Sequence, residues 1–322
     1  MKRIIFLALM AVGAFYAQAQ SLTATLQQGD KVTPFYGENA FRDAYEAAEN
    51  GALITLSTGN HMRDGYFDVR KSITIIGSGA FGEDETISYI NNLNIYADDV
   101  RIEGLFIRES IEFREWVKNT RVLHCYAKNL YGSEHTNTII DQCVIDNNNI
   151  RWGDFKNLCI KNCMIRESES HSTNATFIND AIFKIPGGNC GYATYRNCIM
   201  GVEYWADDLT LQSPGVYYNN VFFRYDDNAE RKDELAILKY AQGCVHSDNT
   251  IDTFNHLYGG VIDLTAMPNT TALGDDETKV GPEGGSGFKF YPAIPSIISK
   301  KIDRQTDAEG KINVNIKVQA AD

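Results

Sequence analysis

Basic charge is scarce in this chain of 322 residues. Its 30 lysine and arginine residues stand against 42 aspartate and glutamate residues, which gives a formal net charge of -12 at pH 7, and no basic run is present. An acidic surface repels polyanions. Nucleic acid and anionic membrane surfaces are therefore excluded as main partners, and a polyanionic sugar would need basic side chains focused in one place.

Metal-binding cysteine spacing is also missing. The seven cysteines include no Cys-x-x-Cys pair with a histidine partner, which is the spacing typical of structural zinc sites. The sequence therefore predicts no metal centre of this kind.

An apolar run stands at the N-terminus. A basic start at Lys2 and Arg3 precedes it, and the small residues Ala17 and Ala19 mark a cleavage site. This arrangement is typical of a secretory signal peptide, and the run is too short to span a membrane. The sequence predicts a signal peptide over residues 1–19 and a mature protein that is secreted or periplasmic, either free or held at the cell surface.

A repeat of roughly twenty residues begins at Asp98, a period typical of solenoids. Its aligned apolar column is Leu105, Cys125, Cys143 and Cys163, continued by Cys198 and Val221. The residues just before this column are Gly104, His124, Gln142, Asn162, Asn197 and Asn220. Glycine and asparagine tolerate left-handed backbone angles, so the pattern predicts a tight bend before each column residue.

The residues before each bend alternate in the way that strands do. Pairs such as Val100 with Ile102 and Leu158 with Ile160 are β-branched or apolar at a period of two. The Leu-x-x-Leu-x-Leu frame of leucine-rich repeats is absent. Such coils stack as parallel strands about 4.8 Å apart, so the pattern predicts a β-solenoid.

This pattern resembles the right-handed, single-stranded parallel β-helix of the pectin-lyase-like family. The resemblance implies an all-β fold, with the β-helix over residues 51–265, and the C-terminal tail resembles those of secreted bacterial proteins linked to polysaccharide utilisation. Residues 20–50 are expected to form an irregular entry segment and a capping helix over residues 39–50, which end at Gly51. Residues 266–322 are expected to form a Gly- and Pro-rich segment and a closing strand hairpin.

The column position also predicts the state of the thiols. Cys125, Cys143, Cys163 and Cys198 should point inward as small apolar groups. Neighbouring coils hold the Cβ atoms about 4.8 Å apart with parallel vectors, which is poor disulfide geometry. The pattern therefore favours buried, reduced cysteines.

Two stretches break the regular spacing. Residues 167–191 and 226–247 are predicted to be insertions that lengthen two coils, and residues 229–243 in the second have the periodicity of a helix. Long insertions in solenoids often carry function. We therefore expect these two to wall a groove.

One strand column is the candidate site, because solenoids place function along one face. The residues expected to bind substrate on its outer side are Glu112, Trp116, Tyr131, Asp154 and Trp205. Aromatic faces beside carboxylates and a guanidinium suit sugar rings and their hydroxyl groups. The alternative is that the aromatic residues fill the core or its bends and the charged ones form a solvated face.

Candidate catalytic residues on the same column are Arg151, Lys184 and Glu203. The Asn-Thr-Asp and Gly-His-Gly motifs of polygalacturonase-like β-helix enzymes are absent. A lyase set would use calcium on carboxylates such as Asp154 and Glu203, with Arg151 or Lys184 as the base. A hydrolase would instead pair Glu112 with Glu203.

Two classes of function stay open after these observations. The first is a secreted protein that binds a polysaccharide or oligosaccharide and cleaves it as a lyase or hydrolase. The second is a non-catalytic glycan-binding or surface scaffold β-helix. A β-helix hosts unrelated functions, so the fold alone does not separate them, and the sequence does not set the oligomeric state.

Overall fold

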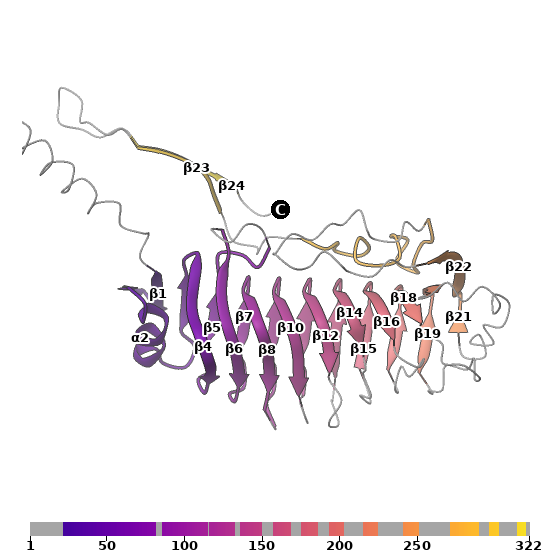
Figure 1. Ribbon diagram of the computed structural model, residues 1–322, viewed down its shortest axis with the longest axis horizontal. Coiled ribbons are helices and arrows are strands. Elements are labelled where there is room, and N and C mark those ends of the chain that lie inside the picture. The colour runs from indigo at the N-terminus through magenta and orange to yellow at the C-terminus, as the bar shows by residue number, and fades with distance from the viewer. Residues whose placement is uncertain are drawn as a thin grey trace, which may run out of the picture.

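The structure is a computed structural model. It describes residues 22–81, 86–114, 116–132, 136–149, 157–168, 175–185, 193–202, 215–224, 241–250, 271–289, 296–302 and 314–319. Within them, two long sheets form a parallel β-solenoid, whose coils are stacked side by side (Figure 1). The predicted parallel β-helix is therefore confirmed.

The first sheet, sheet A, holds short strands. In spatial order its described strands are β2 (Lys31–Tyr36), β1 (Thr23–Gln28), β3 (Leu53–Leu56), β5 (Thr74–Ile76), β7 (Arg101–Glu103), β9 (Arg121–Leu123), β11 (Ile139–Asp141), β13 (Leu158–Lys161), β15 (Ala175–Ile178), β17 (Thr194–Arg196), β19 (Val216–Tyr218) and β21 (Ala241–Gln242). From β3 onward every pairing is parallel.

The second sheet, sheet B, lies across the core from sheet A. Its described strands are β4 (Gly59–Val69), β6 (Ser88–Ile95), β8 (Phe106–Phe113), β10 (Tyr126–Gly132), β12 (Val144–Asn149), β14 (Met164–Ser168), β16 (Ala181–Ile185), β18 (Ile199–Val202), β20 (Val221–Arg224) and β22 (Val245–Thr250). Alternation places apolar side chains of each rung in the core, and they align from strand to strand, as with Ile107, Ala127 and Ile145.

From β7 onward, the bend after each described sheet A strand has positive φ. Its residues are Gly104, His124, Gln142, Asn162, Asn179, Asn197, Asn219 and Gly243. The predicted bend is confirmed, but its last member was misplaced by one residue. Asn219 has the positive φ, so Asn220 and not Val221 continues the buried column. The sequence motif misled because two asparagines stand side by side.

Both predicted insertions contain further coils. Residues 175–185 form strands β15 and β16, with Asn179 at the bend and Asp180 in the buried column. In the second stretch, β21 and β22 continue the two sheets, with Cys244 at the column position. The prediction that these stretches only lengthen two coils was therefore wrong. The first coil was missed because Asp180 stands where its neighbours have a cysteine. Most of the expected helix over 229–243 lies outside the described residues, and its end is strand β21.

The N-terminal end of the solenoid is covered by helix α2 (Ala40–Ala47), as predicted. Its Phe41 ring lies 4.4 Å from the ring of Phe67, at the end of the core. Lys71 donates from Nζ to the carbonyl oxygens of Tyr45, at 2.7 Å, and Ala48, at 2.8 Å. A cation at a helix C-terminus satisfies its last carbonyls and the helix dipole.

The entry segment is a β-hairpin, so the expectation of an irregular entry was wrong. Strand β1 pairs antiparallel with β2 and with β3. The connection is Gly29-Asp30, and Gly29 has a φ of 56°, as a tight hairpin turn requires. At the other end of the chain, β23 (Ser296–Ile302) and β24 (Val314–Gln319) form the predicted antiparallel pair as a separate sheet.

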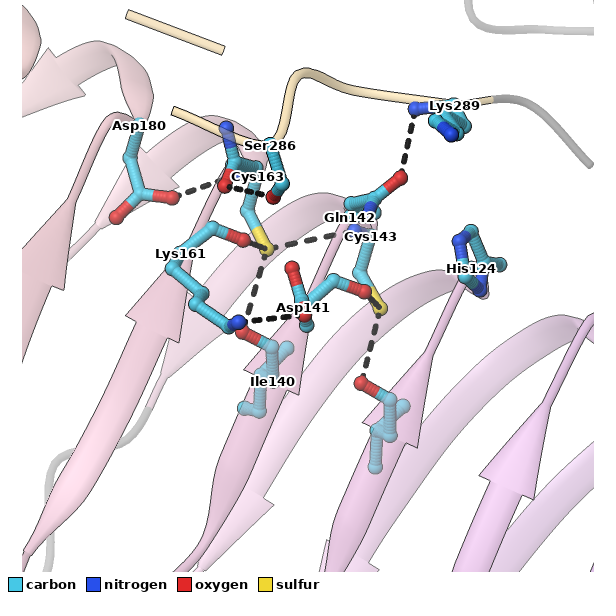
Figure 2. A network of polar contacts seen from close by, with 12 residues as sticks. His124, Ile140, Asp141, Gln142, Cys143, Lys161, Cys163, Asp180, Ser286 and Lys289 are labelled. Atoms are coloured by element: carbon cyan, nitrogen blue, oxygen red, sulfur yellow. Dashed lines mark hydrogen bonds and ion pairs between the residues drawn. The ribbon is translucent and has the colours of Figure 1, made fainter. Parts of the chain in front are cut away.

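A C-terminal segment runs back along the solenoid. We call residues 271–289 the strap; in Figure 1 they lie along the side where the sheet B strands begin. The side chains of the bend hold it. Asn162 donates to the carbonyl oxygens of Pro282, at 3.2 Å, and Gly284, at 2.6 Å, and accepts from Ser286 at 3.1 Å. On the next coil towards the N-terminus, Gln142 accepts from the backbone of Lys289 at 2.8 Å (Figure 2).

The strap also covers an apolar column outside the main core. The first residue of successive sheet B strands is apolar and buried: Tyr126, Val144, Met164, Ala181, Ile199 and Val221. From the strap, Val280 packs into this cluster, and Phe288 lies 5.7 Å from Phe81. Burying apolar surface on both sides of sheet B stabilises the solenoid. The strap is therefore part of the fold.

We expect Asn162→Gly to lower the free energy of unfolding by about 2–3 kcal/mol, because three hydrogen bonds to the strap are lost. Glycine accepts the φ of 50° at this position, so backbone strain does not contribute. The control is Glu277→Gly, which also sits at positive φ but makes no described side-chain hydrogen bond. Denaturant unfolding measures both, and equal stability of the two variants would contradict the role of the strap contacts.

The thiol column agrees with the prediction. Cys125, Cys143, Cys163 and Cys198 are free and buried. Two of the sulfurs contact the preceding coil: the Cys143 sulfur lies 3.4 Å from the Cys125 backbone nitrogen, and the Cys163 sulfur lies 3.3 Å from the Cys143 backbone nitrogen. We expect alkylation of the denatured, unreduced protein to label all four cysteines by mass spectrometry. Protection of any pair would show that the column geometry is wrong.

Asp180 stands in this column without a described ionic partner. Its carboxyl is fully buried and accepts from the backbone N–H groups of Cys163, at 2.7 Å, and Ile178, at 3.0 Å. Burial raises its pKa well above the usual 3.8, although these two donors act in the opposite direction. Asn220 fills the same position two coils further along and accepts from Cys198 at 2.8 Å.

We expect Asp180→Asn to remove a pH dependence of stability. In the wild type, the unfolded chain releases this proton from about pH 4 upward, whereas the folded chain retains it until its higher pKa. Stability therefore falls as the pH rises through that window, and the amide, which cannot ionise, abolishes the fall. Denaturant unfolding between pH 4 and pH 8 measures the free energy of unfolding of both proteins. If the two free energies change with pH in the same way, the prediction is wrong.

Candidate functional site

The described part of the candidate site lies on the outside of sheet B, towards its N-terminal end. The pairing registers place Asp68, Asn94, Glu112 and Tyr131 in one row across β4, β6, β8 and β10. Their neighbours Ile111 and Leu130 are buried in the core, so the row faces outward as the alternation predicted. Residues distant in sequence are thus brought to adjacent strands about 4.8 Å apart.

A second row follows at the ends of these strands. Tyr96 lies between two arginines, with the Arg70 guanidinium 4.1 Å and the Arg114 guanidinium 5.4 Å from its ring centroid. Both distances fall in the range of cation–π contacts. Each arginine also pairs with the outward carboxylate of its own strand, Arg70 with Asp68 and Arg114 with Glu112, both at 2.7 Å. The two rows therefore form one network.

Hydrogen bonds fix the charge state of this network at its first strand. Asn94 donates from Nδ2 to the Asp68 carboxylate at 2.9 Å, and this bond, aided by Arg70, lowers the pKa of Asp68. An ionised carboxylate accepts hydrogen bonds but donates none. Asp68 is therefore suited to bind hydroxyl groups and not to act as a general acid.

Trp116 stands at the turn beyond β8. Its side chain is 69% exposed, and its φ of 72° lies in the left-handed region. A tryptophan at positive φ with most of its surface in solvent is unusual on both counts. Trp116 therefore does not fill the core, whereas the alternative that it belongs to a bend stays open. Tyr131 and Tyr96 are each 38% exposed, so three aromatic side chains reach solvent near the two rows.

The structure brings together only part of the predicted set. Glu112 and Tyr131 are direct cross-strand neighbours, and Trp116 stands at the turn beyond the strand that holds Glu112. Arg151, Asp154, Glu203 and Trp205 lie outside the described residues. Lys184 is described in its backbone alone, and it pairs with Glu167 of β14. Traced from strand to strand, this pairing leads to Ser110 of β8, so Lys184 is not in the same row as Glu112. The roles assigned to these five residues stay predictions.

Phe183 follows the core residue Ile182, so alternation predicts that it lies on the outer side of sheet B, yet it is buried. It lies in the apolar cluster beneath the strap. Alternation predicted its direction correctly, but the covering segment is far away in the sequence.

Four members of the two rows were missed in the sequence: Asp68, Arg70, Asn94 and Tyr96. They precede the first cysteine coil, where the repeat is weakest. A signal was present, because Asp68-x-Arg70, Asn94-x-Tyr96 and Glu112-x-Arg114 share one spacing on successive strands.

Within the described ranges, no group of three or more histidine, cysteine, aspartate or glutamate side chains is arranged to hold a metal ion. The carboxylates of Asp154 and Glu203, named for calcium, belong to the undescribed stretches. Among the described helices, none combines the length and apolarity needed to cross a bilayer.

Comparison with family models, curated proteins and solved structures found no match to this chain. The architecture itself establishes the class, a parallel β-helix protein. Membership of the pectin-lyase-like family stays a prediction.

Proposed function

We propose that this protein binds a polysaccharide through the sheet B face, which we define as Asp68, Arg70, Asn94, Tyr96, Glu112, Arg114, Trp116 and Tyr131. The observation that carries the proposal is the pairing of a fixed carboxylate–guanidinium network with exposed aromatic rings on consecutive strands. Sugar recognition uses both kinds of group, because rings stack on aromatic faces while hydroxyl groups need oriented donors and acceptors.

The spacing of the strands supports an extended ligand. Equivalent side chains repeat at intervals of about 4.8 Å along the solenoid axis, so a linear chain lying along that axis would meet similar groups on each coil. The network is also held in place before any ligand arrives. A preorganised surface loses less conformational entropy on binding than a mobile one.

Cleavage is a further proposal, not required by binding. It rests on Arg151, Lys184 and Glu203, with calcium as the ion that a lyase mechanism would add on carboxylates such as Asp154. The alternative function is a non-catalytic glycan-binding or surface scaffold protein, which would use the same face without those catalytic roles.

Export to the periplasm or the cell exterior is part of the proposal, supported by the leader-like residues 1–19.

The test is incubation of the purified protein with a panel of polysaccharides, with and without calcium. Binding is followed by calorimetry, and unsaturated products or new reducing ends report cleavage. Binding without products would favour the non-catalytic glycan-binding or scaffold function over a lyase or hydrolase. No binding to any member of the panel would overturn the proposed function.

We expect Trp116→Ala to weaken glycan binding by roughly 1–3 kcal/mol, the loss typical of an aromatic contact at a binding site. The fold should be retained, because the side chain is mostly exposed. The matched control is Tyr218→Ala, which removes an exposed aromatic from sheet A. Calorimetry and thermal unfolding measure both variants; equal affinity of Trp116→Ala and wild type would place the groove elsewhere. Trp205→Ala is the parallel test of the second predicted tryptophan.

A further inference from the structure

A cleft of about 310 Å³ opens at the N-terminal end of the solenoid. One wall is strand β4, with His61, Arg63 and Asp64, and the other is the segment at the start of α2, with Glu38, Asn39 and Arg42. None of these residues belongs to the sheet B face. The volume is at the lower end of the range for small-molecule sites.

Two irregularities build this cleft. Strand β4 departs from its register with β6 between Met62 and Tyr66, so that Arg63, Asp64 and Gly65 bulge away from the ladder. Bulges re-aim side chains and are common beside functional sites. The opposite wall is the start of α2, where the N-cap residue Asn39 makes no side-chain capping bond. Its amide is therefore not engaged by the helix that it begins.

The charged side chains of the cleft have no partner among the described residues, unlike those of the neighbouring face. Glu38, Arg42, Arg63 and Asp64 make no hydrogen bond or ion pair with any described residue. On the sheet B face, by contrast, each described carboxylate is paired with an arginine. Two arginines and two carboxylates thus line the cleft without forming ion pairs with each other.

The deep wall is neutral and nearly closed. His61 is 6% exposed and its Nε2 lies 2.7 Å from the carbonyl oxygen of Ser57, so Nε2 carries the proton and donates it. Burial lowers the pKa of His61, which keeps the ring uncharged at neutral pH. Its Nδ1 has no hydrogen-bond partner among the described residues. Beside it, Phe41 and Phe67 supply apolar surface at the base.

This lining selects a class of ligand. Because the formal charges of the two arginines and the two carboxylates cancel, a simple anion or cation gains little net attraction. A neutral molecule rich in hydroxyl groups can use both kinds of group, donating to the carboxylates and accepting from the guanidiniums and amides. The apolar base suits the C–H face of such a ring.

We propose that this cleft is a second carbohydrate site, which takes one neutral sugar unit, either free or at the end of a chain. The identification of the ligand as a sugar rests on the proposed function. Asp64 lies four residues before Asp68 on β4, the first strand of sheet B, so the cleft opens at the N-terminal end of the sheet B face and to one side of its first row. The cleft would then recognise a chain end, whereas the face binds the interior of the chain.

The experiment uses the purified mature protein with glucose, galactose, mannose and xylose as separate probes. Saturation-transfer difference NMR detects the weak binding expected for a single sugar unit. We expect at least one probe to bind saturably, and Arg42→Ala and Arg63→Ala each to weaken that binding roughly tenfold, the effect of losing one charge-assisted hydrogen bond. Both arginines are exposed without described partners, so neither change should affect folding.

The matched control is Arg121→Ala, an exposed arginine of sheet A, which should bind the probe as the wild type does. Trp116→Ala separates the two sites, because it should leave monosaccharide binding unchanged while it weakens polysaccharide binding. Absence of saturable binding by all four sugars, or binding that survives both cleft substitutions, would overturn the cleft proposal. If the proposed function of the sheet B face is wrong, the wild-type protein will bind a monosaccharide in the cleft but will not bind any polysaccharide.

Discussion

Parallel backbone pairing between successive coils is the constraint on which this molecule depends. Each coil donates and accepts hydrogen bonds along the solenoid axis, so every residue position must recur at the spacing of neighbouring strands. A coil can then differ from its neighbours only at its bends and on its outer face. The bends with positive φ accommodate the sharp change of direction, and asparagine, glutamine, histidine and glycine fill them.

The same bend side chains have a second role, in joining the solenoid to the strap. Asn162, Asn197 and Gln142 keep the backbone in the left-handed region and also hold residues of a distant segment. The strap covers an apolar column that would otherwise be exposed on sheet B. Exposed apolar surface and open sheet faces promote aggregation, so this cover protects the fold as well as stabilising it.

The strap also decides where a ligand can reach the solenoid. It occupies the side on which the sheet B strands begin, while the described rows of the sheet B face lie at their other ends. The exposed aromatics Tyr96, Trp116 and Tyr131 are therefore left uncovered, whereas Phe183 is buried. The cap at α2 closes the core but leaves a polar cleft beside the β4 bulge.

The sequence by itself determined the coil period, the inward column from Leu105 to Cys198, the helix over Phe41 and the outward row of Glu112 and Tyr131. These follow from alternation and spacing, which are local properties of strands and helices. Only the tertiary structure revealed the coil at Asp180, where a buried carboxyl replaces the expected cysteine, and the arginine–tyrosine row at the N-terminal coils. It alone revealed the strap as well, because the contact of Lys289 with Gln142 joins residues 147 positions apart. No local period encodes such a pairing, which depends on how the completed solenoid presents its outer surface.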